Sequence, residues 1–252
     1  MEKRYTLIVY TVLTVLLFVI VIGLIGWAAD PGTENKNIKG AADISVEESA
    51  SADEEKEVGE TEWTQSDDWR LILVNQQYPL DRDYQAPMIK LSNGYSVDER
   101  CYSDLQQMMD DCRAAGLSPL ICSGYRSYDK QVELFENQIE ANIQSGDDVE
   151  SARIKAGMAV AVPGTSEHQL GLALDIVDSS HQILDEMQES TPVQKWLVEN
   201  SWRYGFILRY PNEKSYITGI QYEPWHYRYV GRDAAQEMHR QGVCLEEYLG
   251  AQ

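Results

Sequence analysis

The chain has 252 residues, of which 43% are hydrophobic and 25% are charged, and its formal net charge is −20. This length can hold one globular domain and additional segments, judged against about 100–200 residues per domain. The excess of acidic residues argues against nucleic acid as a partner, because the sequence has no basic stripe to meet the phosphates.

An uncharged apolar run follows the first four residues. It covers residues 5–29 and exceeds the roughly 20 residues that cross a bilayer. Lys3 and Arg4 precede the run, which predicts a cytoplasmic N-terminus and an extracytoplasmic remainder. The run is longer than a signal-peptide core and its cleavage pattern is poor. We therefore expect residues 1–29 to be an uncleaved single-pass anchor in the cell membrane, with a cleaved export signal as the alternative.

The next segment, residues 30–68, is strongly acidic. It contains thirteen acidic residues against three lysines. Such a composition has too little apolar content to offset the entropy lost on ordering, and its self-repulsion favours extended conformations. We expect a disordered linker that holds the following domain away from the membrane.

Residues 69–252 alternate short apolar runs with amphipathic stretches and contain no evident internal repeat. Apolar spacing, caps and glycine stops predict helices over residues 102–115, 127–143, 150–160, 192–204 and 233–240. Short apolar or aromatic runs predict strands over residues 118–122, 171–177, 206–210 and 221–230. We expect one compact α+β domain in which a small antiparallel sheet is flanked by helices.

A first polar pair lies on either side of a glycine. His168 and Asp175 are seven residues apart with Gly171 between them, so a turn can present the imidazole and the following strand the carboxylate. On that strand Ala173 and Val177 share a face with Asp175, and the small Ala173 leaves room for a metal. The alternative interpretation is a surface histidine and an unrelated aspartate at a strand end.

A second polar pair, Glu223 and His226, flanks Pro224 and Trp225. On a flat strand the two side chains would face opposite sides, whereas a bend at Pro224 would bring both into one cleft. The alternative is an aromatic strand edge with incidental polar residues. Together the two pairs offer two imidazoles, a ligating carboxylate and a spare carboxylate, which is the set that a catalytic zinc site needs. We therefore expect Zn²⁺ and metal-assisted amide hydrolysis.

A third motif places Arg126 between a predicted strand and a predicted helix. The planar fork of a guanidinium suits an oxyanion or a carboxylate. The alternative is a solvated arginine in a helix-capping loop.

Other residues with metal-binding chemistry receive no role in this prediction. Glu167 ranks below Asp175 as a ligand, because an extended backbone would point it away from its neighbour in sequence. His181 and His239 are expected to lie in solvent. Cys122 is expected to be a small buried residue, and the sequence leaves open whether Cys101, Cys112 and Cys244 form disulfides.

The three motifs, in this order, resemble those of the zinc D-alanyl-D-alanine carboxypeptidases of the VanY type, which are bacterial peptidoglycan peptidases. The resemblance covers residues 71–248. Its carriers are Leu71-Ile-Leu-Val-Asn-Gln-Gln-Tyr-Pro-Leu80, Ser123-Gly-Tyr-Arg-Ser127, Pro163-Gly-Thr-Ser-Glu-His168 with Gly171-Leu-Ala-Leu-Asp175, and Tyr222-Glu-Pro-Trp-His-Tyr-Arg-Tyr229. No ligand position departs from the family pattern.

The resemblance implies a role for each residue at the centre of these motifs. His168, Asp175 and His226 would bind zinc. Glu223 would be the base that activates the zinc-bound water. Arg126 would polarise the scissile carbonyl and stabilise the developing oxyanion.

The resemblance also implies a substrate, the peptidoglycan stem peptide or its precursors. Ser166 and Gln131 match family positions that help hold the C-terminal residue of that peptide, and Trp225 could wall the cleft. Removal of the terminal D-alanine from stem pentapeptides is the expected reaction. In the family this trimming can remove the target of glycopeptide antibiotics, so resistance and ordinary wall maturation are both open as roles.

Two alternative functions remain at this point. Relatives with the same motifs act as L,D-carboxypeptidases on stem tetrapeptides, and the residues that would discriminate lie in loops that the sequence does not assign. The other alternative is a non-catalytic, zinc-containing module that binds peptidoglycan. Retention of Glu223 and Arg126 argues against it, because a pure binder needs neither a base nor an oxyanion partner.

Overall fold

The computed structural model describes residues 64–251 of the chain. The predicted anchor of residues 1–29 and most of the predicted linker of residues 30–68 lie outside the described residues. Within the described range, no helix combines the length and the apolar character needed to cross a membrane.

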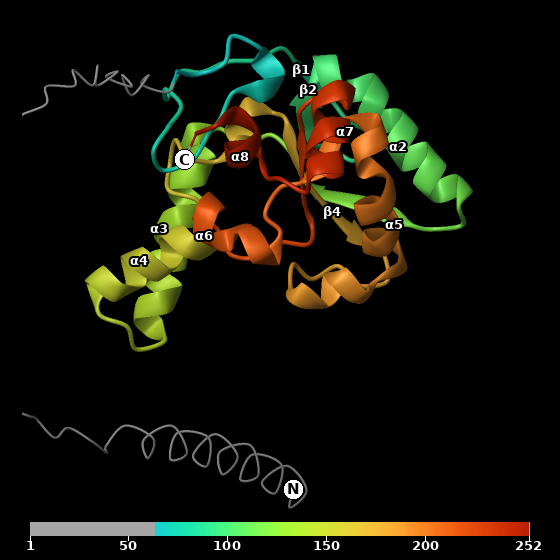
Figure 1. The fold of residues 1–252 in the computed structure, drawn as a ribbon. Coiled ribbons are helices and arrows are strands. Elements are labelled where there is room, and N and C mark those ends of the chain that lie inside the picture. Colours follow the sequence, from blue (N-terminus) through green and yellow to red (C-terminus); the bar gives the residue numbers. More distant parts are fainter. Residues whose placement is uncertain (1–63, 252) are drawn as a thin grey trace, which may run out of the picture. The chain divides into compact units, whose positions relative to one another are not determined.

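A four-stranded antiparallel sheet lies at the centre of the described region (Figure 1). Its strand order is β3-β4-β6-β5. Its strands are β3 (Pro119–Ser123), β4 (Ala173–Asp178), β6 (His226–Tyr229) and β5 (Phe206–Leu208). A separate antiparallel ribbon pairs β1 (Met88–Lys90) with β2 (Ser96–Asp98). Sequence-distant segments therefore meet in the sheet, because β6 lies between β4 and β5 although it follows both in the chain.

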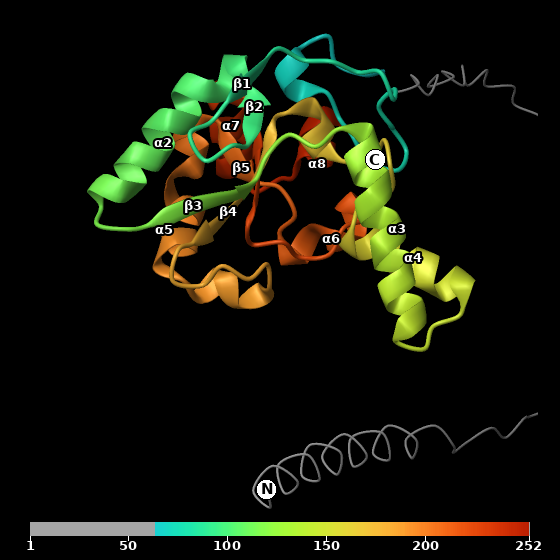
Figure 2. The same ribbon diagram turned by 180° about the vertical axis from the view of Figure 1, so that it is seen from behind.

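Helices flank the sheet, as expected for the α+β class. They are α2 (Tyr102–Ala114), α3 (Tyr128–Gln144), α4 (Val149–Ala159), α5 (Pro192–Asn200), α6 (Ser215–Thr218), α7 (Arg232–Gln241) and α8 (Leu245–Leu249). Helices α3 and α4 form a hairpin that projects from the region on the side opposite α2 and α5 (Figure 2). The predicted compact α+β domain, in which a small antiparallel sheet is flanked by helices, is thus confirmed, and the β1-β2 ribbon is an additional small sheet.

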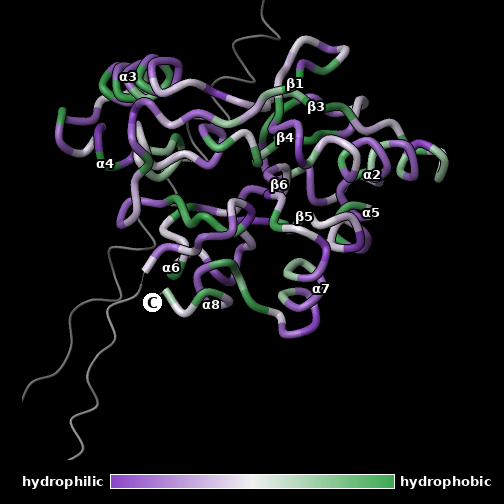
Figure 3. Tube along the Cα trace, turned by 90° about the horizontal axis from the view of Figure 1, so that it is seen from above, coloured by the Kyte–Doolittle hydropathy of each residue, from purple (hydrophilic) through white to green (hydrophobic). Residues whose placement is uncertain are grey.

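The two faces of the sheet pack against different partners. Leu174 and Ile176 of β4 belong to the main core, which also contains Met108 of α2. A second cluster joins Ile207 of β5 to helices α7 and α8. Figure 3 shows hydrophobic residues along β3, whereas β6 is coloured as hydrophilic. Because side chains alternate along a strand, Asp175 points away from the main core.

Two strands are shorter than predicted. The prediction over 221–230 is wrong for its first half, because β6 begins only at His226. The preceding residues form a turn, in which the His226 N–H donates to the Glu223 carbonyl at 3.1 Å. The strand predicted over 206–210 ends at Leu208, because its partner strand β6 begins only at His226.

The helix predicted over 192–204 changes character near its end. It is α-helical as far as Asn200 and continues as a 3-10 helix, η5 (Ser201–Tyr204). Gly205 then ends the helical segment in the left-handed conformation, with φ 84°. The predicted stop is therefore correct, and only the helix type differs.

The four cysteines are free thiols. Three of them, Cys101, Cys112 and Cys244, are buried. Cys122 is half-buried instead of fully buried, and its thiol lies 3.4 Å from the Asp175 carbonyl oxygen. The structure therefore shows no disulfide within the described range.

Candidate active site

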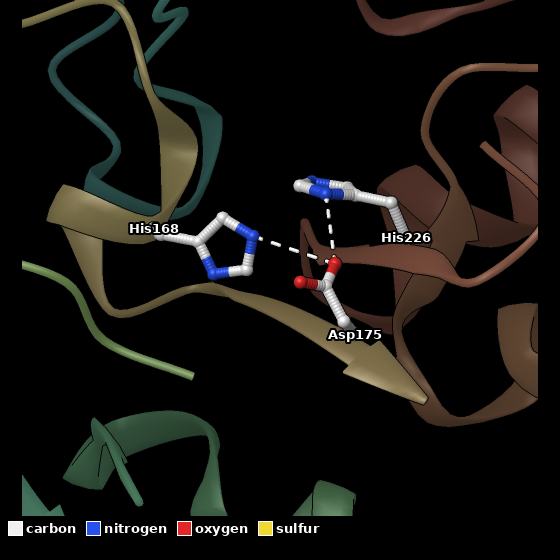
Figure 4. A group of neighbouring side chains, drawn as sticks. All are labelled: His168, Asp175 and His226. Atoms are coloured by element: carbon white, nitrogen blue, oxygen red, sulfur yellow. Dashed lines mark ion pairs between the residues drawn. The ribbon is translucent and has the colours of Figure 1, made fainter. Parts of the chain in front are cut away.

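Three segments bring the predicted metal ligands together (Figure 4). His168 lies in a short 3-10 helix, η3 (Glu167–Leu170), and Asp175 lies on β4. His226 is the first residue of β6 and is paired directly with Asp175 across the two strands. Cross-strand neighbours on one face of a sheet lie side by side, so this register places the carboxylate against the second imidazole.

Both imidazole rings point at one oxygen of the aspartate. Nε2 of His168 lies 3.4 Å from Oδ1 of Asp175, and Nδ1 of His226 lies 3.3 Å from the same oxygen. One donor atom from each of the three residues falls within 4.8 Å of the other two. Such a cluster can hold one metal ion.

The donor atoms suit a zinc ion. Nε2 of His168 and Oδ1 of Asp175 are buried and have no hydrogen-bond partner, an arrangement that costs about 1–3 kcal/mol for each group left unsatisfied. Nδ1 of His168 lies 2.7 Å from the Gly124 carbonyl oxygen, so its N–H donates there and the Nε2 lone pair faces the cluster. Burial, followed by the charge of Arg126, lowers the pKa of His168 to about 4 and keeps the imidazole neutral.

Glu223 faces the cluster from the turn before β6. Its Oε2 lies 3.4 Å from Nδ1 of His226, and the side chain is 14% exposed. Burial raises the pKa of the Glu223 carboxyl to about 7. A carboxylate with such a pKa can take and return a proton near neutral pH. The bend predicted at Pro224 is present, because the turn carries Glu223 and His226 into the same cleft.

Arg126 approaches the cluster from the loop between β3 and α3. Its backbone N–H donates to the His168 carbonyl at 3.1 Å, and its Nη2 lies 3.9 Å from Oδ2 of Asp175. Its Nη1 donates to Oε1 of Gln131 at 3.0 Å, while its Nε is buried without a partner. The guanidinium therefore keeps donor capacity for a bound ligand.

The remaining predicted substrate contacts divide into two groups. Ser166 and Trp225 line the cleft, which has a volume of about 410 Å³ and also contains Arg126 and the metal cluster. Gln131 is buried behind Arg126, where its amide also donates to the Ala161 carbonyl at 2.7 Å. Its position supports a role through the arginine, and direct contact between Gln131 and a substrate stays a prediction.

Two residues at the cluster were not assigned roles by sequence reasoning. Oε2 of Glu167 lies 3.5 Å from Nε2 of His226, and the Tyr210 ring lies 4.8 Å from the His226 ring between centroids. A signal for Glu167 exists in the chain, since Arg209 and Arg228 fall in strand-like apolar runs and buried arginines require carboxylate partners.

The two other histidines lie outside the cleft. His181 is partly buried, and its Nε2 lies 2.8 Å from Oδ1 of Asp185. His239 stacks on Trp202 with ring centroids 4.5 Å apart. Neither belongs to the metal cluster. His239 is exposed, as predicted, whereas His181 is only partly exposed.

Comparisons with known proteins identify a matching family model and several relatives. Residues 94–232 match the family model VanY, described as D-alanyl-D-alanine carboxypeptidase. A D-alanyl-D-alanine carboxypeptidase of Enterococcus faecalis is 47% identical over 186 residues, which cover 73% of this chain and 67% of that protein. The match thus extends over most of the described residues.

Several solved structures are also similar to this chain. VanYB in complex with D-alanine-D-alanine is 46% identical with a TM-score of 0.67, covering 73% of this chain and 99% of that one. A mutant of the vancomycin resistance D,D-pentapeptidase VanY in complex with Zn(II) is 46% identical, with a TM-score of 0.66 and coverage of 72% and 99%. The LD-carboxypeptidase LdcB is 37% identical, with a TM-score of 0.64 and coverage of 72% and 86%. The chain therefore belongs to the VanY family of D-alanyl-D-alanine carboxypeptidases, which are zinc metallopeptidases.

Proposed function

We propose that this protein is a zinc-dependent D,D-carboxypeptidase that removes the terminal D-alanine from peptidoglycan stem pentapeptides. The observation that carries the proposal is one cleft containing a His/Asp/His cluster, a non-ligating carboxylate and an arginine with free donor capacity. The related structure with bound D-alanine-D-alanine supports the choice of substrate. A contribution to glycopeptide resistance is supported by the relative from a vancomycin resistance cassette.

The residues of the cleft account for each step of amide hydrolysis. Zinc, when held by His168, Asp175 and His226, supplies a Lewis acid and lowers the pKa of a water molecule. Glu223 takes a proton from the attacking water as the water oxygen bonds to the carbonyl carbon. Glu223 then passes that proton to the amine of the leaving D-alanine as the C–N bond breaks.

Arg126 stabilises the charge that develops on the carbonyl oxygen during attack. Its position is fixed before substrate arrives, because the His168 carbonyl holds its backbone and Gln131 holds one guanidinium nitrogen. A hydrogen-bond donor that is already in position stabilises the transition state more than a mobile donor does, because it needs no rearrangement during the reaction.

We also propose a location. Residues 1–29 anchor the protein in the cell membrane, residues 30–68 act as the linker, and residues 69–252 form the extracytoplasmic carboxypeptidase domain. The apolar run behind Lys3 and Arg4 supports this arrangement. Two experiments test this location. On cell fractionation the protein should sediment with the membranes. Protease added to intact protoplasts should digest the carboxypeptidase domain.

The substrate proposal is tested by mass spectrometry of the full chain in detergent, incubated with muramyl pentapeptide or tetrapeptide, with and without a chelator. Loss of one alanine from the pentapeptide, abolished by the chelator, is the expected result. Cleavage of the tetrapeptide alone would assign the L,D-carboxypeptidase activity, which the similarity to LdcB favours as the second candidate. Two intact peptides beside a zinc-loaded protein would instead indicate the non-catalytic binding module.

A further inference from the structure

Behind the metal cluster lies a buried group of four charged side chains. Arg209 and Arg228 are fully buried, and Glu167 and Glu246 are each 1% exposed. Nε of Arg209 donates to Oε1 of Glu167 at 2.7 Å, and Nη1 of Arg228 donates to the same oxygen at 2.8 Å. Glu246 receives two further bonds from Arg209, at 2.6 and 2.9 Å. The formal charges of the four side chains balance.

Glu167 uses only one of its two oxygens in this group. Its Oε2 is buried, has no hydrogen-bond partner, and lies 3.5 Å from Nε2 of His226. That nitrogen is itself buried and without a hydrogen-bond partner. Two unsatisfied polar atoms thus face each other, one able to accept and the other able to donate, and buried atoms of this kind are normally paired.

We propose that Glu167 is a positioning residue that accepts the Nε2 proton of His226 and thereby aims the Nδ1 lone pair at the metal. A neutral imidazole carries one N–H, so a proton held on Nε2 leaves Nδ1 as the ligand atom. Nδ1 is the nitrogen that faces Asp175, at 3.3 Å from its Oδ1. A carboxylate in this place fixes the tautomer and the ring orientation and raises the basicity of the ligand.

The two metal-binding histidines are therefore oriented by different partners. His168 offers Nε2 to the cluster and is held through Nδ1 by the Gly124 carbonyl. His226 offers the opposite nitrogen and is held by a charged carboxylate. The arginines make this possible, since a buried carboxylate that lacks partners would be costly. Arg228 is itself anchored by the carbonyls of Arg70 and Ile72, at 2.9 and 3.0 Å.

A pair of matched variants tests the proposal in the full chain. Glu167→Gln and Glu246→Gln each remove one carboxylate from Arg209 in the same buried group. Glu167 also faces His226, whereas Glu246 pairs with Arg209. Zinc affinity is measured by competition with a chromogenic chelator. Glu167→Gln should weaken zinc binding by about 10–100-fold, while Glu246→Gln should bind zinc as the unmodified protein does. Unchanged affinity in Glu167→Gln, or equal losses in both variants, would overturn the proposal.

A second measurement needs no variant. In the zinc-loaded protein, long-range ¹H–¹⁵N spectra of the histidine rings report which nitrogen carries the proton. His226 should be protonated on Nε2 and His168 on Nδ1. A proton on Nδ1 of His226 would overturn the proposal, even if Glu167→Gln fails to fold.

The inference rests on the zinc site of the proposed function and not on its peptide substrate. Peptides left uncut, with the expected zinc affinities and tautomers, would contradict the proposed function alone. Cleavage of the pentapeptide with the wrong His226 tautomer would contradict the role of Glu167 alone.

Discussion

Glu223 faces the three proposed metal ligands, and its replacement should separate catalysis from metal binding. In Glu223→Gln the amide cannot take a proton from water, so kcat should fall by about 10²–10⁴-fold. The three ligands are untouched, and zinc measured by mass spectrometry should stay near one atom per chain. Turnover is measured as D-alanine release from the pentapeptide. A glutamine variant with nearly normal turnover would show that another group is the base.

His226→Ala is the complementary change, because it removes a proposed ligand and keeps the proposed base, Glu223. We therefore expect the variant to lose both zinc and activity. Excess zinc should not restore full turnover, because two protein ligands remain where the site needs three. If His226→Ala keeps normal zinc content and normal turnover, His226 is not a ligand.

Sequence patterns found the centre of the site because its residues lie within short motifs. His168 and Asp175 are joined by one turn, and Glu223 and His226 by another, so their proximity follows from local geometry. The role of Glu167 could not be predicted in this way. Its partners Arg209 and Arg228 lie 42 and 61 residues away, and only the folded sheet brings them together.

At the scale of elements, the turn between η3 and β4 connects two ligands and depends on Gly171. This residue has φ 75°, and a Cβ built there would lie 2.6 Å from Cε of Met88 and 3.0 Å from the Asp98 nitrogen. Gly171→Ala should therefore incur the left-handed strain of about 1–2 kcal/mol and a steric clash. In urea unfolding, Gly171→Ala should lose more free energy of unfolding than Gly242→Ala. At Gly242 φ is 69°, and no atom lies within 4 Å of the added Cβ. Equal losses would contradict this reasoning.

Helices were predicted more accurately than strands because their ends carry local signals. Ser127 caps α3 by accepting from the Lys130 N–H, and Thr191 caps α5 by accepting from the Gln194 N–H. Strand ends depend on the partner strand instead. The aromatic run over 221–230 looks continuous in the sequence, yet β6 pairs with β4 and β5 only from His226 onward.

At the scale of the whole molecule, the metal cluster joins η3, β4 and β6, so zinc should stabilise the fold as well as catalyse the reaction. A ligand that binds only the native state adds about 2.7 kcal/mol at a free concentration 100 times its Kd. For a domain of this size that corresponds to a Tm increase of roughly 5–10 °C. Removal of zinc by a chelator should lower the Tm accordingly, because the buried donor atoms of His168 and Asp175 are again left unsatisfied.

Two variants separate this linkage from a general effect of the chelator. Glu223→Gln keeps all three ligands, so its melting temperature should fall on chelation as much as that of the unmodified protein. His226→Ala should melt at one temperature with and without the chelator, since it has no zinc to lose. The measurement is differential scanning calorimetry at fixed protein concentration. If the unmodified protein melts at the same temperature in both states, the cluster contributes nothing to stability and zinc acts in catalysis alone.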